Sequence, residues 1–148
     1  MEKLFSKPIG IVLNNLGPNQ LAYFAIKSIN KLNLNVSLFY ENMALPCLDV
    51  NAPIMTINEI WPFKGILIAT SIDTAIRINK VVGEISRIFY VYDLEWIRNK
   101  TNFIYNMEAF HSNIEIIARS NEHAKLIENY SNRKVSRVVS YFEIDKMI

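Results

Sequence analysis

Residues 87–96 read Arg87-Ile-Phe-Tyr-Val-Tyr-Asp-Leu-Glu-Trp96, and this stretch decides the fold. Its first part, Arg87–Tyr92, is a nearly continuous run of β-branched and aromatic side chains, which is typical of a strand buried on both faces. The run breaks abruptly at Asp93 and Glu95, two carboxylates beside Trp96. Because ligands of open parallel sheets bind just beyond the carboxyl ends of the strands, we expect a site where this strand ends.

Apolar runs of strand length alternate with helical patterns on both sides of this stretch. The expected strands, with Ile54–Ile57 as a short candidate, are Ile9–Leu13, Val36–Tyr40, Gly65–Thr70, Arg87–Tyr92, Ile114–Ala118 and Val135–Val139. Such alternation predicts an α/β fold in which helices cover both faces of a parallel sheet. We therefore predict a single three-layer, Rossmann-like domain over residues 1–148, with about six strands in the order 3-2-1-4-5-6.

This strand order also predicts where a ligand binds. We expect the switch point between the first strand, Ile9–Leu13, and the organising strand, Arg87–Tyr92. The loops 14–19 and 93–96 should then face each other across one crevice.

Capping residues predict the helix boundaries. Pro18 suits the first turn of a helix that runs to Leu32. Ser71 suits the N-cap of a helix that Gly83 ends, and Ser120 suits the N-cap of a helix over 121–130. Between these two, Thr101 is expected to open another helix. The apolar faces expected for the helices after Ser71 and Thr101 are Ile72, Ala75, Ile76 and Val82, and Phe103, Ile104, Met107 and Phe110.

Composition excludes several classes of protein. The chain has 148 residues, of which 51% are hydrophobic and 20% charged, as in a globular domain with a genuine core. The net charge of +2 is too small to indicate nucleic acid or an anionic membrane as a partner. Cys47 is the single cysteine, which favours a reducing, cytoplasmic location. No apolar run approaches the length of a membrane span, and His111 and His123 stand apart, so we expect no metal site.

The loop after the first strand, residues 14–19, lacks the glycines of a dinucleotide-binding turn. Such a turn needs three glycines, and this loop has only Gly17, so we expect no dinucleotide cofactor. Asn14, Asn15 and Asn19 are suited to hydrogen-bond a polar ligand. Asparagine also favours turns for local reasons, and both interpretations remain open.

The residues that follow the organising strand also allow two interpretations each. Asp93 suits either a base or hydroxyl-binding acceptor, or the cap of the segment that follows. Trp96 suits either stacking on a sugar ring or packing beneath Ile97, and Glu95 is a weaker candidate for the same site. Near the C-terminus, a basic cluster suits either a solvated face or a phosphate contact; it comprises Arg119, Lys125, Arg133, Lys134 and Arg137.

Two C-terminal segments carry a resemblance to a known family. They read Ile116-Ile-Ala-Arg-Ser-Asn-Glu-His123 and Lys134-Val-Ser-Arg-Val-Val-Ser-Tyr-Phe-Glu-Ile-Asp145. They resemble the end of the N-terminal half of a GT-B glycosyltransferase, whose last strand leads into an Asn-Gly-(Ile/Val)-Asp turn. Here Ile144-Asp145 is kept and Asn-Gly is lost. Tyr92-Asp93 similarly resembles the family's strand-end His-Asp, with Tyr92 in place of the His, and Gly17 resembles part of its glycine loop.

The resemblance implies an acceptor-binding domain. In that family the nucleotide sugar binds mostly to a second domain, so we expect a separate donor-binding chain, or a second copy in a homodimer, to complete the cleft. Asp93 would then orient an acceptor hydroxyl, with Tyr92 and Trp96 as a platform for the sugar. Pro18 removes an N–H group from the expected helix start, so we predict that this chain alone does not bind nucleotide sugars.

An alternative is a non-catalytic binding or assembly module that kept the fold and lost the chemistry. Exposed apolar residues in Met43–Phe63 would serve such an interface. We also expect the C-terminal tail to leave apolar surface open, which favours self-association. The tail residues concerned are Tyr141, Phe142, Ile144, Met147 and Ile148.

Overall fold

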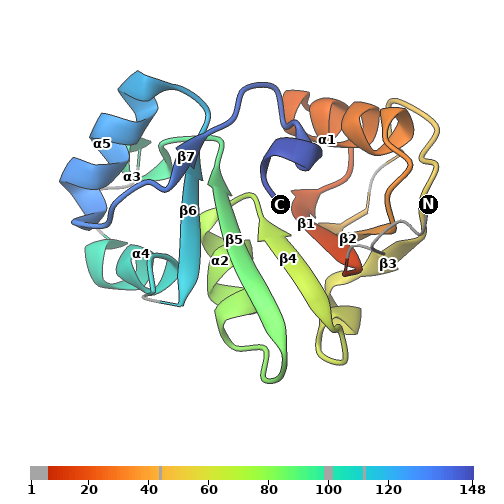
Figure 1. Ribbon diagram of the computed structural model, residues 1–148, viewed down its shortest axis with the longest axis horizontal. Coiled ribbons are helices and arrows are strands. Elements are labelled where there is room, and N and C mark those ends of the chain that lie inside the picture. The colour runs from red at the N-terminus through yellow and green to blue at the C-terminus, as the bar shows by residue number, and fades with distance from the viewer. Residues whose placement is uncertain (1–6, 44, 99–101, 112) are drawn as a thin grey trace, which may run out of the picture.

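A computed structural model describes residues 7–43, 45–98, 102–111 and 113–148 and has an open sheet at its centre (Figure 1). All strand pairings are parallel, and the order is β3-β2-β1-β4-β5-β6-β7. The strands are β1 Ile9–Asn15, β2 Val36–Asn42, β3 Ile54–Thr56, β4 Gly65–Ala69, β5 Ile85–Val91, β6 Ile114–Ala118 and β7 Arg137–Val138. The predicted Rossmann-like α/β fold and its strand order are therefore confirmed, with a seventh strand, β7, at the edge.

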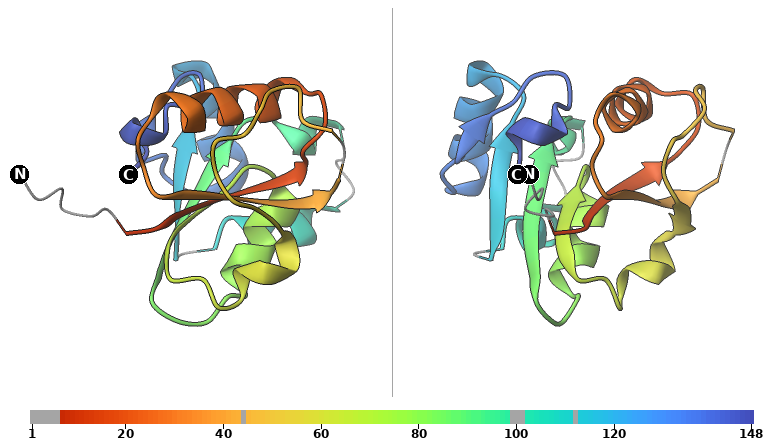
Figure 2. Two further views of the ribbon diagram at one scale, coloured as in Figure 1. Left: turned by 90° about the vertical axis from the view of Figure 1, so that its right-hand side faces the viewer. Right: turned by 45° about the vertical axis from the view of Figure 1, so that its right-hand side comes forward.

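Helices and short turns cover both faces of the sheet (Figure 2). They are α1 Gln20–Lys31, η1 Ile57–Ile60, α2 Ile72–Asn79, α3 Glu95–Arg98, α4 Phe103–Ala109, α5 Asn121–Ser131 and η3 Ile144–Lys146. On one face, α1 and the C-terminal segment pack against Ile11, Ile68 and Tyr90. On the other face, α2, α4 and α5 pack against residues such as Leu67 and Phe89. Successive strand residues thus point into two separate cores, as a sheet buried on both sides requires.

The helices begin at side-chain caps. Ser71 and Ser120 are N-caps, as predicted, and each hydroxyl accepts a backbone N–H bond from the residue three positions later. The α1 cap differs from the prediction, because Asn19 Oδ1 accepts the Ala22 N–H bond at 2.8 Å. Pro18 therefore lies outside the helix, and the N–H groups of its first turn are intact.

Two expected helix faces are partly wrong. The α2 helix ends at Asn79, so Val82 lies beyond it and is 90% exposed. In α4, Phe103 and Ile104 face solvent, whereas the helix buries Asn106 and Ala109. The buried face of α4 therefore includes a polar contact, because Asn106 Nδ2 donates to Tyr130 Oη of α5 at 3.1 Å. Thr101, the expected start of this helix, lies outside the described residues.

The C-terminal segment is built into the domain. The α1 helix covers β1 and β2, and the chain after β7 returns over β5 and β6 on the same face (Figures 1 and 2). Phe142, Ile144 and Met147 are fully buried there, whereas Tyr141 and Ile148 stay exposed. Three of the five tail residues expected to form an exposed interface therefore belong to the core, which removes part of the argument for self-association.

Candidate functional site

A crevice of about 370 Å³ opens at the carboxyl edge of the sheet. The chain leaves β1 toward α1 on one face and leaves β4 toward α2 on the other, so the switch point lies between these two strands. The residues that line the crevice are Leu13, Asn14, Asn15, Asn19, Gln20, Leu21, Thr70, Ser71, Tyr92 and Asp93.

The crevice is lined by residues of both predicted loops, but the strands beside it differ from the prediction. We expected β1 and β5 to flank the switch point, but β4 lies between them and pairs with both. Thr70 and Ser71, which follow β4, therefore form the middle of the crevice. Ser71 was expected only as a helix cap. The expected switch point placed Arg87–Tyr92 beside the first strand, so neither Thr70 nor Ser71 was expected in the crevice. Their position at the end of an apolar strand was the available signal.

The asparagines of the first loop hold its shape. Asn15 Oδ1 accepts a bond from the Gly17 N–H group at 2.8 Å, and Asn19 Nδ2 donates to the Asn15 and Gly17 carbonyls at 3.1 and 3.0 Å. Gly17 is buried and does not line the crevice. Asn15 and Asn19 do line it, so both turn formation and ligand contact are compatible with their positions.

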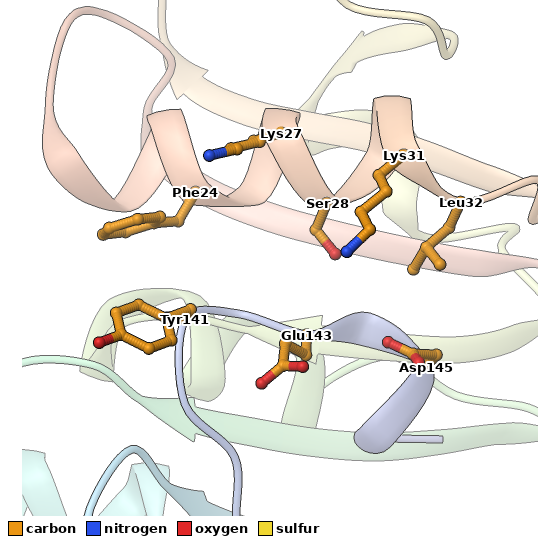
Figure 3. A pocket seen from close by; sticks show the side chains of 8 residues that line it. All are labelled: Phe24, Lys27, Ser28, Lys31, Leu32, Tyr141, Glu143 and Asp145. Carbon is orange, nitrogen blue, oxygen red and sulfur yellow. The ribbon is translucent and has the colours of Figure 1, made fainter.

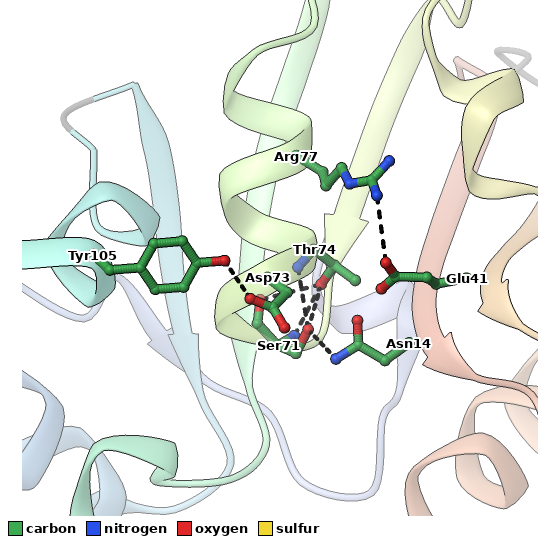
Figure 4. A network of polar contacts seen from close by, with 7 residues as sticks. All are labelled: Asn14, Glu41, Ser71, Asp73, Thr74, Arg77 and Tyr105. Atoms are coloured by element: carbon green, nitrogen blue, oxygen red, sulfur yellow. Dashed lines mark hydrogen bonds and ion pairs between the residues drawn. The ribbon is translucent and has the colours of Figure 1, made fainter. Parts of the chain in front are cut away.

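The start of α2 forms a polar network beside the crevice (Figure 4). Asn14 Nδ2 donates to Ser71 Oγ at 2.8 Å, and Ser71 and Thr74 make the reciprocal bonds of a capping box. Asn14 Oδ1 is buried and has no hydrogen-bond partner among the described residues. Thr70 Oγ1 donates to the Val12 carbonyl at 2.7 Å. These bonds fix the central wall of the crevice, because they tie β1 and β4 to the helix start.

Tyr92 and Asp93 directly follow β5 and form the third side of the crevice. Tyr92 is buried, and its O–H group donates to Gln20 Oε1 on α1. Burial raises the pKa of Tyr92 above its ordinary value of 10.0, and nearby Asp93 acts in the same direction, whereas Arg119 opposes the shift. Tyr92 is therefore a hydrogen-bond donor at neutral pH and not a base. The Asp93 side chain is exposed and is the carboxylate of the crevice lining.

Glu95 and Trp96 lie outside the crevice, contrary to expectation. Glu95 Oε2 accepts the Ile72 N–H bond at 2.8 Å at the start of α2. Burial is the main cause that raises the pKa of this carboxyl group. Trp96 is 7% exposed and stacks on Tyr130 with 4.5 Å between ring centroids. The helix α3 begins at Glu95, and the side chains of Glu95 and Trp96 do not line the crevice. Trp96 therefore cannot serve as a sugar platform in this arrangement.

A second groove, of about 320 Å³, adjoins the crevice. The two share Gln20 and Tyr92, so they form one continuous polar surface along the carboxyl edge. The other residues of this groove are Phe24, Arg119, Ser120, His123, Ser140 and Tyr141. Arg119 belongs to the basic cluster expected from the sequence, whereas Gln20 and Ser140 were not expected because neither belongs to a recognisable motif.

Another cavity, of about 510 Å³, lies between α1 and the C-terminal segment (Figure 3). Lys27 and Lys31 line it from α1, whereas Glu143 and Asp145 line it from the opposite side. Asp145 belongs to the Ile144-Asp145 pair on which the glycosyltransferase resemblance partly rests. The neighbouring Ile144 is a buried core residue that docks the C-terminal segment, and neither residue lines the crevice.

No group of three or more His, Cys, Asp or Glu side chains that could hold a metal ion occurs in the described parts of the chain. None of the described helices is long and apolar enough to cross a bilayer.

Comparison with known proteins returned no match to a family model, a curated protein or a solved structure. The parallel Rossmann-like sheet is thus established by the structure, and the glycosyltransferase resemblance rests on the short motifs alone.

Proposed function

We propose that this chain binds a hydroxyl-rich small molecule, of the sugar or polyol class, in the crevice at the β1–β4 switch point. The observation that carries this proposal is the convergence of Asp93, Asn15 and Asn19 on one crevice. A hydroxyl group both donates and accepts hydrogen bonds, and this lining offers a carboxylate acceptor beside the amide of Asn15, which does both. The Asn19 amide adds an acceptor oxygen, because its N–H groups are bonded within the loop. Pockets at switch points are also the usual ligand sites of open α/β sheets.

Asp93 is the residue that we propose to orient a ligand hydroxyl. It accepts through two oxygens, and its exposed position lets it bind a ligand without first losing a protein partner. In a glycosyltransferase-like reaction, the same carboxylate would position the acceptor hydroxyl. A second chain, or a second copy of this one, would then supply the donor-binding half.

A non-catalytic role for the same crevice is the second candidate. One observation favours it, namely that Glu95 binds the start of α2 and Tyr92 remains protonated, so Asp93 is the one carboxylate in the lining. A site with a single titratable group suited to accept a proton can bind a sugar without performing transfer. Both candidates predict the same ligand class, and they differ in whether a partner chain confers activity.

The test is a titration of the ¹⁵N-labelled protein with glucose, mannose, galactose, N-acetylglucosamine and glycerol, followed by amide chemical shifts. We expect at least one compound to shift amides of residues 13–21, 70–71 and 92–93 in a saturable way. Asp93→Asn keeps the shape and removes the charge, and hydrogen bonds to charged groups contribute about 1.5–3 kcal/mol, so affinity should fall about tenfold or more.

Asp49→Asn is the matched control, because it removes an exposed carboxylate from a loop that does not line the crevice. It should leave the affinity unchanged. Shifts confined to another surface, or equal affinity in the two variants, would refute the proposal. Millimolar UDP-, GDP- or ADP-sugars form a further arm in which we expect no stabilisation. Saturating binding would raise the melting temperature by several degrees, since a ligand at a hundred times its Kd adds about 2.7 kcal/mol.

A further inference from the structure

The groove next to the crevice presents mostly hydrogen-bond donors. Arg119 and Ser120 come from the end of β6 and the start of α5, His123 from the first turn of α5, and Ser140 from the segment after β7. Phe24 and Tyr141 form apolar walls on the remaining side. This groove is not needed for the hydroxyl-binding site described above, and its chemistry differs, since no carboxylate lines it.

Arg119 is the charged group of this groove, and the protein does not neutralise it. The ion pairs of the described residues join Arg77 to Glu41, Arg137 to Glu115 and Lys146 to Glu143, and none involves Arg119. Its guanidinium group lies 4.6 Å from the centroid of the Tyr92 ring, which is itself held by the bond to Gln20. A guanidinium group over an aromatic face is held in place, and its five N–H donors leave some that can bind an anion.

We infer that the ligand of the crevice carries a phosphate ester, which binds at Arg119 while the hydroxyl groups of the same molecule bind at Asp93. Only the part of this inference that places hydroxyl groups at Asp93 rests on the proposed function. A phosphate group has acceptor oxygens pointing in several directions, so it can bind Arg119 and the Ser140 hydroxyl at once. The planar fork of arginine suits two of these oxygens.

The side chains, rather than the start of the α5 helix, define this anion site. Ser120 Oγ already accepts the His123 N–H bond at 3.1 Å, so the helix caps itself. Arg119 lies over the Tyr92 ring and lines the groove, whereas Asp93 follows Tyr92 in sequence and lines the crevice. The negative charge of Asp93 repels a phosphate from the crevice end. The two charges together therefore fix the direction in which a phosphorylated sugar lies along the edge of the sheet.

The experiment compares neutral and phosphorylated members of the same pairs by amide chemical-shift titration of the full chain. The pairs are glucose with glucose 6-phosphate, mannose with mannose 6-phosphate, and glycerol with glycerol 3-phosphate; inorganic phosphate and glucuronate are added alone. We expect at least one phosphorylated member to bind about 10- to 100-fold more tightly than its neutral partner, the range of hydrogen bonds to a charged group. Shifts should appear at residues 119–123 and 140–141 as well as at the crevice.

Arg119→Gln should abolish this gain, whereas Arg119→Lys should retain part of it because the charge remains. Lys125→Gln is the matched control: it removes one positive charge from exposed surface on α5, away from the groove. It should leave the gain unchanged. The melting temperature of each variant verifies that the fold is intact, and Arg119→Lys keeps the test decisive if Arg119→Gln unfolds.

The outcomes separate the two proposals. Neutral sugars that bind through Asp93 with no gain from phosphate would overturn the phosphate site and leave the proposed function standing. If phosphate compounds bind through Arg119 and their affinity is unchanged by Asp93→Asn, the result would support the anion site and refute the hydroxyl site. Glucuronate that binds as tightly as the phosphate esters would overturn the assignment to phosphate. No binding by any of these compounds would refute both.

Discussion

Replacing Phe142 by alanine tests whether the C-terminal segment is an integral part of the domain. The structure buries this side chain fully, although sequence reasoning placed it on an exposed tail. Its ring meets the Tyr90 ring edge-on, with 5.1 Å between centroids and 87° between planes. The adjacent Tyr90 O–H group donates to the Val139 carbonyl at 2.6 Å, so one residue of β5 anchors both ends of the turn.

The expected cost follows from burial. Truncation of a fully buried phenylalanine to alanine costs about 3–5 kcal/mol, which includes the cavity left behind. For a domain of this size, that loss lowers the melting temperature by about 6–20 °C. Tyr141→Ala is a close control, because Tyr141 and Phe142 share the same left-handed backbone, with φ of 56°. Any cost of placing alanine in this conformation cancels in the comparison, and Tyr141 is 73% exposed. We expect Tyr141→Ala to cost less than about 1 kcal/mol.

The assay is equilibrium unfolding in urea, followed in parallel by far-ultraviolet circular dichroism and by tryptophan fluorescence. Coincident transitions with equal slopes would justify a two-state free energy of unfolding. Phe142→Leu, which removes less volume, gives a second measurement if the alanine variant is unfolded at 25 °C. Equal stability of Phe142→Ala and Tyr141→Ala would show that the segment does not pack as described. It would also remove Ser140 and Tyr141 as fixed walls of the groove.

Two further predictions concern single residues. Glu95→Gln should make the stability of the protein less dependent on pH. Burial raises the pKa of Glu95 from 4.5, so the folded state holds this proton more tightly than the unfolded state does. The wild type therefore loses stability as the pH rises from about 4.5 through the raised value. The difference between wild-type and variant urea curves from pH 4 to 7 measures this, and a difference independent of pH would contradict it. Gly65→Ala should cost about 1–3 kcal/mol more than Gly83→Ala. Both glycines have positive φ, but a Cβ at Gly65 would lie 2.1 Å from the Pro8 carbonyl oxygen, whereas at Gly83 it meets nothing within 4 Å. Equal thermal stability of the two variants would refute this.

The strand order was predictable from the sequence because the central strands β1, β4, β5 and β6 are apolar runs with clear ends. Patterns of that kind depend on local residues and on the general rule for parallel crossovers. The caps Ser71 and Ser120 were predictable for the same local reason. The tail was not, because Phe142 and its neighbours follow no periodic pattern. Their burial depends on a face of β5 and β6 that α1 leaves uncovered, which is a property of the assembled sheet.

The candidate site was predictable only in part, for a related reason. Asp93 follows β5 and Asn15 is the last residue of β1, and the rule for strand ends places such residues on one edge. Trp96 stands three residues after Asp93, but its direction is set by the turn into α3 and by the aromatic ring of Tyr130. The end of a strand therefore predicts the location of the first one or two residues of the loop that follows. Tertiary packing determines where the side chains of the later loop residues lie.

Tyr92 explains why the crevice and the groove act as one surface. Burial raises the pKa of Tyr92, so this side chain stays protonated near neutral pH. A histidine there would titrate in that range and could accept a proton. The tyrosine instead donates to Gln20 and carries the Arg119 guanidinium over its ring, which links the proposed hydroxyl end to the proposed phosphate end. A tyrosine at this position favours recognition of a ligand over proton transfer to it. Any transfer chemistry in such a site would therefore depend on Asp93 and on groups brought by a partner.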